Sequence, residues 1–220
     1  MRRLIVLRPE PGASATVDKA RAMGLEAVAI PLFEVRPLAW EAPDAGGFDG
    51  LLLTSANAVR QGGKGLHKLR GLPAYAVGEA TAETAREAGF DVAATGDGGV
   101  ERLLDSVEAD LKLLHLCGAD RRNLGEARQQ LTTIPVYRVD LIEADVSAAV
   151  GAVALIHSPR AARRFAELVR DKESITVAAI SAATAEAAGP GWEQVQVADR
   201  PSDEALLALA ARLCNKPGAQ

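Results

Sequence analysis

The stretch LLLTSANAVR at residues 51–60 aligns without a gap with ALIHSPRAAR at residues 154–163, a shift of 103 residues. The same shift brings VGEATAE at residues 77–83 onto ISAATAE at residues 180–186. A period of about a hundred residues is far longer than the repeat of a solenoid. The repeat therefore predicts two copies of one domain.

Each copy alternates short apolar runs, bounded by turn residues, with Ala-rich stretches of helical character. This alternation is typical of βα units on a parallel sheet. The predicted fold class is α/β, with two similar parallel-sheet domains joined by a two-stranded linker. Strands are expected at Leu4–Leu7, Leu51–Thr54, Ala74–Val77, Leu113–Leu116, Val153–His157 and Val177–Ile180.

Two segments look like linkers. A shift of 104 residues carries PLFEV at 31–35 onto PVYRV at 135–139. The segments Phe33–Leu38 and Tyr137–Ile142 are extended, mix apolar with charged residues, and precede loop-like acidic stretches. They are interpreted as antiparallel strands of a hinge, with a ligand cleft between the domains. The expected bounds are 1–35 with 143–220 for domain 1, 41–134 for domain 2, and 36–40 and 135–142 for the linker strands.

Composition excludes several classes of protein. The 220 residues are 48% hydrophobic but contain no stretch of about 20 apolar residues, so no membrane segment is expected. A net charge of −4 with 4% aromatic residues argues against nucleic acid as a partner. Cys117 and Cys214 form no CxxC pair and have no nearby His cluster, which indicates neither a disulfide nor a metal site. We expect a cytoplasmic monomer.

The usual nucleotide and hydrolase motifs are missing. The sequence contains no G-x-G-x-x-G after the first strand, no G-x-x-x-x-G-K-[ST] and no G-x-S-x-G. The glycine cluster Gly62–Gly65 interrupts a helical stretch and is interpreted as a mobile loop. His67, His115 and His157 have no evident acid partner in the sequence, and the last two are expected in core or strand-end positions.

Four strand-to-helix junctions are the candidate ligand site. Each junction places a hydroxyl or a glycine near a helix start, which is explained by helix capping alone. They also lie where open parallel sheets bind ligands, and helix amides there favour carboxylates or phosphates. The junctions are Thr54–Asn57, Gly78–Thr81, His157–Arg160 and Ser181–Thr184.

Arginines occur beside these junctions. Arg8 ends the first strand, Arg121 and Arg122 follow the strand at 113–116, and Arg160 lies in the third junction loop. A guanidinium group pairs well with a carboxylate, although each arginine alone is also explained as a solvated surface charge. The group as a whole predicts an anionic ligand.

Tyr137 is the most distinctive single side chain. It lies in the second linker segment at the position where the first copy has Phe33. A residue in a hinge can face a cleft, whereas the alternative is a packing residue with its hydroxyl in water.

Seven short motifs resemble those of the uroporphyrinogen-III synthase family, in the order of that family. They are LRP at 7–9, TSANAVR at 54–60, AVGEATA at 76–82, LCGADRR at 116–122, VYR at 136–138, HSPR at 157–160 and TA at 184–185. The resemblance implies two α/β domains, one inserted into the other. It also implies an enzyme that cyclises the linear tetrapyrrole hydroxymethylbilane, with loss of water and inversion of the last pyrrole, and without a metal or organic cofactor.

The resemblance also implies the roles of particular residues. Position by position it points to Ser55, Thr81, Ser158 and Thr184 for substrate binding, beside Arg8, Arg121 and Arg160 from the reasoning above. Tyr137 becomes the candidate to assist departure of the substrate hydroxyl. Two alternatives stay open: a two-lobed binding or regulatory module for a small polyanionic ligand, and an α/β transferase acting on a phosphorylated substrate, which the missing phosphate motifs disfavour.

Overall fold

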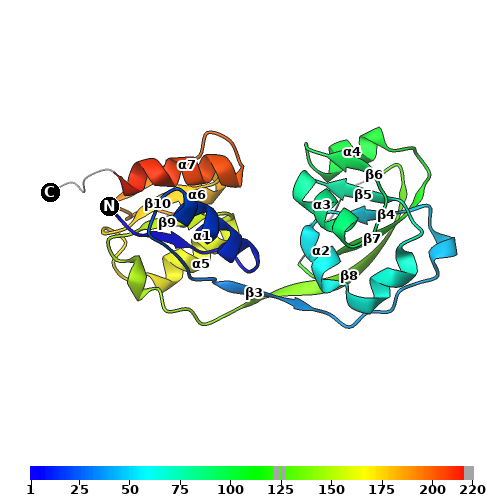
Figure 1. Cartoon of the computed structure of the whole chain (residues 1–220), viewed down its shortest axis with the longest axis horizontal. Coiled ribbons are helices and arrows are strands. Elements are labelled where there is room, and N and C mark those ends of the chain that lie inside the picture. Colours follow the sequence, from blue (N-terminus) through cyan, green and yellow to red (C-terminus); the bar gives the residue numbers. More distant parts are fainter. Residues whose placement is uncertain (121–123, 125–126, 216–220) are drawn as a thin grey trace. The chain divides into compact units, whose positions relative to one another are not determined.

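The computed structural model describes residues 1–120, 124 and 127–215 (Figure 1). The chain divides into two compact units. Unit 1 comprises Met1–Glu34 and Leu141–Gln220, and unit 2 comprises Val35–Asp140. Each unit contains one mainly parallel sheet flanked by helices, so the predicted α/β class is confirmed.

Unit 1 is built on a five-stranded parallel sheet in the order β11-β10-β9-β1-β2. Its strands are β1 (Leu4–Val6), β2 (Ala27–Ala29), β9 (Val153–Ile156), β10 (Thr176–Ala179) and β11 (Gln194–Val197). Its helices are α1 (Gly12–Ala22), α5 (Pro159–Leu168), α6 (Ala182–Ala188) and α7 (Asp203–Cys214), with a 3-10 turn at Ser147–Ala149.

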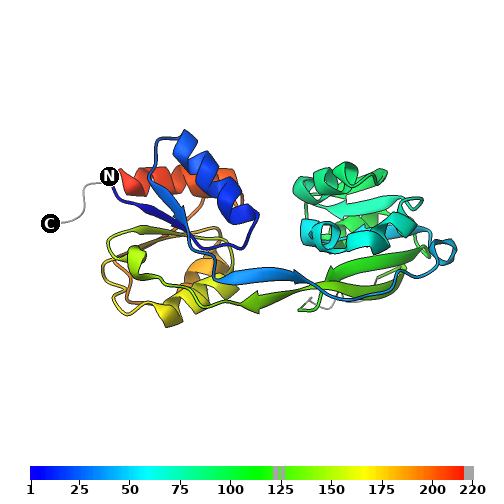
Figure 2. The same cartoon turned by 60° about the horizontal axis from the view of Figure 1, so that its bottom comes forward.

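Alternating side chains of this sheet divide between two helical layers. Leu4 and Val6 of β1 share a buried cluster with residues of α1 and α7, including Leu206. Ile5, between them, points to the opposite face of the sheet, because successive side chains of a strand alternate. It is fully buried as well. Helices α5 and α6 cover that second face (Figure 2). Two covered faces explain why the central strands are continuous apolar runs.

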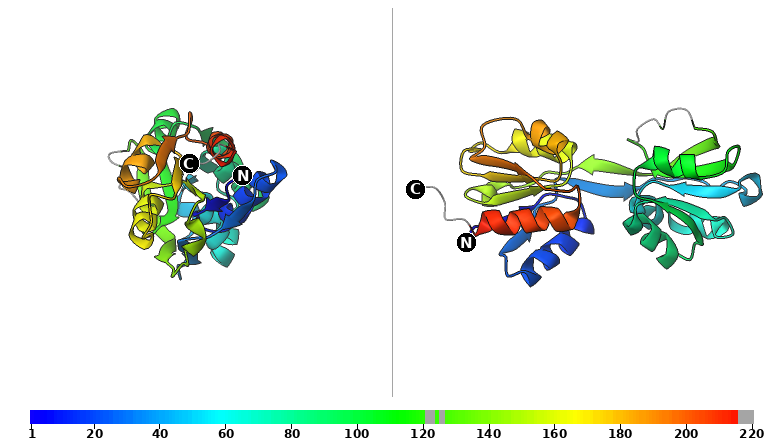
Figure 3. Two further views of the ribbon diagram at one scale, coloured as in Figure 1. Left: turned by 90° about the vertical axis from the view of Figure 1, so that its left-hand side faces the viewer. Right: turned by 90° about the horizontal axis from the view of Figure 1, so that it is seen from above.

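Unit 2 carries a six-stranded sheet in the order β3-β8-β7-β4-β5-β6. Its strands are β3 (Phe33–Pro37), β4 (Gly50–Leu53), β5 (Ala74–Val77), β6 (Val92–Gly96), β7 (Lys112–Gly118) and β8 (Gln130–Leu141). Its helices are α2 (Ala56–Gln61), α3 (Glu79–Glu87) and α4 (Val100–Ser106), with 3-10 helices at Ala45–Gly47 and Gly63–Leu69. The right-hand view of Figure 3 shows the helices of each unit beside its strands.

The segments predicted as linkers are β3 and the end of β8. Leu38 N–H donates to Val136 O at 2.9 Å, and Ile142 N–H donates to Leu32 O at 3.2 Å, so the two strands run antiparallel. Strand β8 begins at Gln130, well before the predicted linker. Its first half pairs in parallel with β7, from Lys112 opposite Gln130 to Gly118 opposite Tyr137.

The prediction of a loop at Gly62–Gly65 was wrong. Residues Gly63–Leu69 form a 3-10 helix that directly follows α2. Leu66 and Leu69 are buried in the unit 2 core, and the Trp40 ring lies against Gly65, where a Cβ atom would come within 2.7 Å of it. Gly62 and Gly65 allow close packing here, whereas Gly63 adopts a φ of 61°, a conformation that favours glycine. Within the described residues, no helix combines the length and the hydropathy that a membrane span requires.

Arg2 ties three strands of unit 1 together at the amino end of the sheet. Its guanidinium donates to the carbonyl oxygens of Gly151, Ala152 and Ser174 and to Thr176 Oγ1, at 2.8–3.1 Å. It also forms an ion pair with Glu193 at 2.7 Å, and only 17% of its side chain is exposed. Arg3, the next residue, makes one exposed ion pair with Glu26.

We therefore expect Arg2→Met to lower the free energy of unfolding of unit 1 by about 2–4 kcal/mol, because it removes four hydrogen bonds and an ion pair made by a mostly buried guanidinium group. Arg3→Met is the matched control and should change it by less than about 0.5 kcal/mol. Urea denaturation followed by Trp192 fluorescence in a Trp40→Phe background reports unit 1 alone, since the chain has two tryptophans. Equal midpoints for the two variants would contradict this role of Arg2.

Candidate functional site

The strand order of unit 1 reverses direction between β1 and β9, which are neighbours in the sheet. Val6 lies opposite Leu155 in their register, and Arg8 and His157 each follow two residues later. Both side chains thus emerge at the carboxyl edge of the sheet, at its topological switch point. Ligands of open parallel sheets bind at this place.

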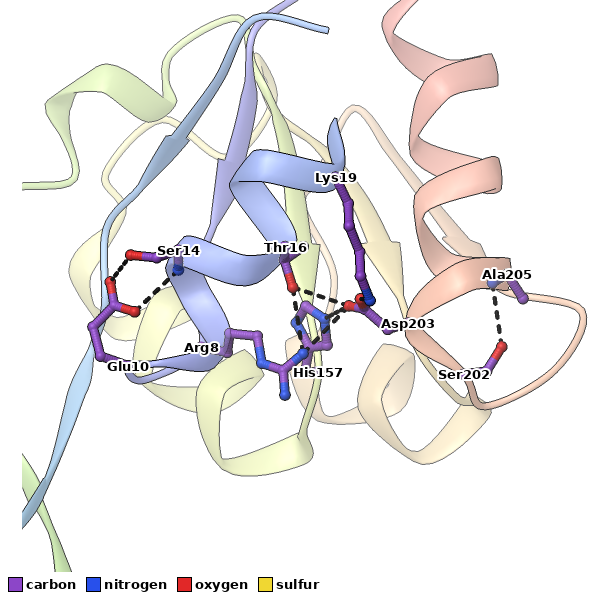
Figure 4. A network of polar contacts seen from close by, with 9 residues as sticks. All are labelled: Arg8, Glu10, Ser14, Thr16, Lys19, His157, Ser202, Asp203 and Ala205. Carbon is purple, nitrogen blue, oxygen red and sulfur yellow. Dashed lines mark hydrogen bonds and ion pairs between the residues drawn. The ribbon is translucent and has the colours of Figure 1, made fainter. Parts of the chain in front are cut away.

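Asp203 gathers the polar side chains at this edge (Figure 4). Its Oδ1 accepts from His157 Nε2 at 3.0 Å, Thr16 Oγ1 at 3.0 Å and Arg8 Nη1 at 3.3 Å. Its Oδ2 accepts from Lys19 Nζ at 3.0 Å. We call Arg8, Thr16, Lys19, His157 and Asp203 the Asp203 cluster.

Local sequence explains how these residues meet. Ser202 caps α7 by accepting from Ala205 N–H at 3.2 Å, which places Asp203 in the first helical turn, where the helix dipole favours a carboxylate. Thr16 and Lys19 are three residues apart on α1 and therefore lie on one face of that helix. The sequence interpretation missed this acid partner of His157, although Ser-Asp-Glu before an apolar helix is a recognisable helix start.

The cluster holds an ionised carboxylate and a neutral imidazole. The hydrogen bond from His157, with those from Lys19 and Thr16, holds the pKa of Asp203 well below its usual range against the opposing effect of burial. Burial lowers the pKa of His157, and the charge of Arg8 adds to this. An ionised carboxylate only accepts hydrogen bonds, so Nε2 carries the proton. Nδ1 is buried without a partner among the described residues, and protonating it would bury an unsatisfied N–H.

A pH dependence of stability follows. The pKa of His157 is lower in the folded chain than the 6.5 of a free histidine, so the unfolded chain takes up a proton first as the pH falls. We expect the stability of unit 1 to decrease as the pH drops from about 7 through about 6. His157→Gln keeps a donor for Asp203 and does not titrate, so its urea midpoint should fall less over that range. His67 and His115 belong to unit 2, so Trp192 fluorescence isolates this effect. Parallel pH profiles of the two proteins would contradict it.

The other predicted residues of unit 1 lie at the adjacent helix starts. Ser158 caps α5 by accepting from Ala161 N–H at 3.2 Å. Arg160 lies in the first turn of α5 rather than in a loop, and its guanidinium lies over the Phe33 ring at 4.8 Å. Thr184 is fully buried in α6, with its hydroxyl 3.0 Å from that of the cap residue Ser181.

Unit 2 repeats this arrangement at its own switch point, between β4 and β7. Ser55 caps α2 by accepting from Asn57 N–H at 3.2 Å, as Ser158 caps α5. Thr81 is buried in the first turn of α3, at the position that corresponds to Thr184. Gly78, which precedes α3, has φ of 81°, a conformation that favours glycine. Thr54 Oγ1 lies 3.0 Å from His115 Nε2, a pair that the sequence interpretation missed.

Tyr137 lies opposite Gly118 at the carboxyl end of β7. A Cβ atom on Gly118 would come within 2.9 Å of Tyr137 Cζ and 3.1 Å of its hydroxyl oxygen, so the phenol lies directly over the Gly118 backbone. Ala119 N–H donates to Tyr137 O at 2.8 Å and fixes the strand there. Arg121, the remaining predicted residue, lies outside the described residues.

Among the residues that the structure describes, no group of three or more His, Cys, Asp or Glu side chains is placed to hold a metal ion. The predicted residues that the structure describes lie at helix starts, carry hydroxyl groups or, in unit 1, are arginines. Such groups bind anionic oxygen atoms.

Fold and site together define a protein of two parallel α/β units whose sheets present helix starts and hydroxyl groups at their carboxyl edges. The family model described as Uroporphyrinogen-III synthase HemD matches residues 14–208. The chain belongs to this family, whose members are enzymes of tetrapyrrole biosynthesis that cyclise hydroxymethylbilane.

Individual relatives agree with this family. A uroporphyrinogen-III synthase of Chlorobaculum parvum is 38% identical over 61 residues, which are 27% of this chain and only 25% of that protein. The crystal structure of uroporphyrinogen-III synthetase from Helicobacter pylori 26695 matches with a TM-score of 0.70 at 24% identity, over 97% of this chain and 100% of that one. A mutant uroporphyrinogen III synthase from the extremely thermophilic bacterium Thermus thermophilus matches with a TM-score of 0.55 at 19% identity, over 98% and 100% of the two chains. At these identities the two structures support the fold.

Proposed function

We propose that this chain is itself a uroporphyrinogen-III synthase. Hydroxymethylbilane loses its terminal hydroxyl as water to give an azafulvene, which the substituted carbon of the last pyrrole attacks. The spiro intermediate then fragments and closes again with that ring reversed. The observation that carries the proposal is the family match, because it spans residues 14–208 and so includes parts of both units.

The geometry of the helix starts supports a substrate with eight carboxylates. In each unit two neighbouring helices begin at the carboxyl edge of a parallel sheet, where free amides and the helix dipole attract anions. We assign carboxylate binding to the residues at these starts and to two arginines of unit 1: Ser55, Thr81, Ser158, Thr184, Arg8 and Arg160. Capping uses the lone pairs of Ser55 and Ser158 but leaves their hydroxyl protons for a ligand.

We assign to Tyr137 the role of assisting departure of the substrate hydroxyl. Its phenol lies at the carboxyl end of β7, the strand next to the switch point of unit 2. Proximity and electrostatic stabilisation of a reactive substrate would supply most of the remaining rate. The proposal needs no metal or organic cofactor, and it places a monomeric enzyme in the cytoplasm.

The first test is an isomer assay. Freshly made hydroxymethylbilane is supplied, the products are oxidised to porphyrins, and the type I and type III isomers are separated. Predominant type III establishes the synthase. Type I alone, the product of spontaneous closure, from a protein whose folding is verified by circular dichroism would leave the binding-module alternative.

A further inference from the structure

We propose that Asp203 is a positioning residue: together with Gly12 it orients the Arg8 guanidinium as a receptor for one carboxylate group of the substrate. The identity of that substrate rests on the proposed function. The receptor itself is argued from the Asp203 cluster, which lies wholly within unit 1.

Asp203 is fully engaged by protein donors. Three donors converge on Oδ1 and the Lys19 ammonium binds Oδ2, all within 3.3 Å. An ionised carboxylate held by four donors from the β1 end, α1 and the β9 end is poorly placed to act as a base. Its effect is to fix the side chains around it, above all Arg8 and His157.

Among the described residues, the Arg8 guanidinium is hydrogen-bonded through one nitrogen, Nη1. Its hydrogen bonds to the described residues all use Nη1, to Thr16 Oγ1 at 3.4 Å and to Asp203 Oδ1 at 3.3 Å. The N–H groups of Nε and Nη2 make no hydrogen bond to the described residues, so they are available to a ligand. The side chain is 34% exposed. Two parallel N–H groups on one edge of a guanidinium match the two oxygens of a carboxylate.

Gly12 leaves the space that this orientation needs. A Cβ atom at Gly12, in the first turn of α1, would lie 2.5 Å from Arg8 Nε, 2.8 Å from Cζ and 2.9 Å from Nη2. Any side chain at this position therefore forces the guanidinium to move. Because the clash is with the end of a flexible side chain, the helix itself tolerates the change.

The charges of the cluster favour an anion. Arg8 and Lys19 are positive, Asp203 is negative and His157 is neutral, which leaves one positive charge on a chain whose net charge is −4. The Glu10 carboxylate is not part of this cluster: it lies apart from Asp203 in Figure 4 and accepts from the Ser14 amide at 3.0 Å and from the Ser14 hydroxyl at 2.8 Å.

The internal repeat shows that this cluster belongs to one unit only. At the shift of 103 residues, His157 corresponds to Thr54 and Asp203 corresponds to Val100. At this aligned position unit 2 has an apolar side chain in place of the carboxylate. The described residues of the two units therefore differ at this point of the repeat, and such a difference is what an enzyme needs to distinguish the two ends of a linear substrate.

Two variants displace Arg8 by independent routes. Asp203→Asn removes the charge that holds the guanidinium, and Gly12→Ala occupies its space. Each should raise the KM for hydroxymethylbilane about tenfold and leave kcat within about twofold, because a positioned charged hydrogen bond is lost in the bound and the transition state alike. Glu26→Gln, which breaks the exposed Arg3 ion pair of the same unit, is the control and should leave KM unchanged.

Gly12→Ala also separates positioning from stability. Alanine favours a helix more than glycine, so the urea midpoint of this variant should not fall. Direct binding of uroporphyrin III, a stable octacarboxylate, is measured in parallel by fluorescence quenching, and both variants should bind it about tenfold more weakly.

The activity assay and the binding measurement distinguish a failure of this inference from a failure of the proposed function. If the wild-type protein makes the type III isomer but Gly12→Ala changes neither KM nor the affinity for uroporphyrin III, the inference is overturned and the function stands. If the wild-type protein makes no type III isomer, the proposed function fails, and the binding arm still decides the inference. Equal affinities of wild type and Gly12→Ala, or no binding by either, overturn it, and a weaker affinity of the variant supports it.

Discussion

Tyr137→Phe is expected to lower the turnover of hydroxymethylbilane to the type III isomer by about a hundredfold, because a positioned acid that assists loss of the hydroxyl contributes about 10²–10⁴ to a rate. The fold should be unaffected. The aromatic ring still covers Gly118, and the backbone bond from Ala119 N–H to Tyr137 O does not involve the hydroxyl. The measurement is the initial rate of type III formation at saturating substrate, with the urea midpoint of each protein.

Tyr75→Phe is the matched control, because Tyr75 in β5 is the other tyrosine of the chain and lies in the same unit. It should retain nearly full turnover. Full activity of Tyr137→Phe would remove the acid role and leave Tyr137 as a packing residue. A loss of activity that a lower urea midpoint accompanies would indicate a structural role instead.

Phe165→Ala is expected to lower the free energy of unfolding of unit 1 by about 3–5 kcal/mol, the usual cost of removing a buried aromatic ring. Phe165 in α5 is fully buried, and its ring stacks on that of Trp192, with centroids 5.4 Å apart and an interplanar angle of 8°. Trp192 is fixed by its own bond from Nε1 to Ala188 O at 3.1 Å. The substitution therefore leaves a cavity between α5, α6 and the sheet that its neighbours cannot readily fill.

Urea denaturation followed by Trp192 fluorescence in the Trp40→Phe background measures this effect. Phe165→Leu is the graded control and should cost less, because it keeps part of the buried volume but loses the ring stacking. If Phe165→Ala and wild type unfold at the same urea concentration, the second helical layer does not stabilise unit 1 as described.

The strands predicted from the sequence are those at the centres of the two sheets. Strands β1, β4, β5, β7, β9 and β10 lie within a few residues of the expected ranges, because a strand covered on both faces is a continuous apolar run. Strands β2, β6 and β11 were not predicted. Each lies at the edge of its sheet, and β6 and β11 are mostly half-exposed or exposed, so their sequences lack that apolar signal.

The candidate site was predictable only in its local parts. Ser55, Ser158 and Thr184 stand at helix starts because capping depends on residues within one turn, which a sequence displays directly. The partner of His157, which follows β9, is Asp203, 46 residues away in α7. No local pattern relates the two, and only the parallel order β9-β1 together with α7 packing beside β9 brings them to 3.0 Å.

The sequence by itself determined the duplication, the α/β class, the central strands and the helix starts, because each of these depends on periodicity or on contacts within a few residues. Only the tertiary structure decided how the side chains at those starts are used. In the folded chain Asp203 accepts hydrogen bonds from Arg8 and His157, and the Tyr137 phenol lies over Gly118. The predicted glycine loop is a packed 3-10 helix. These pairings depend on strand order and on the space between packed elements, and both arise only when distant segments of the chain meet.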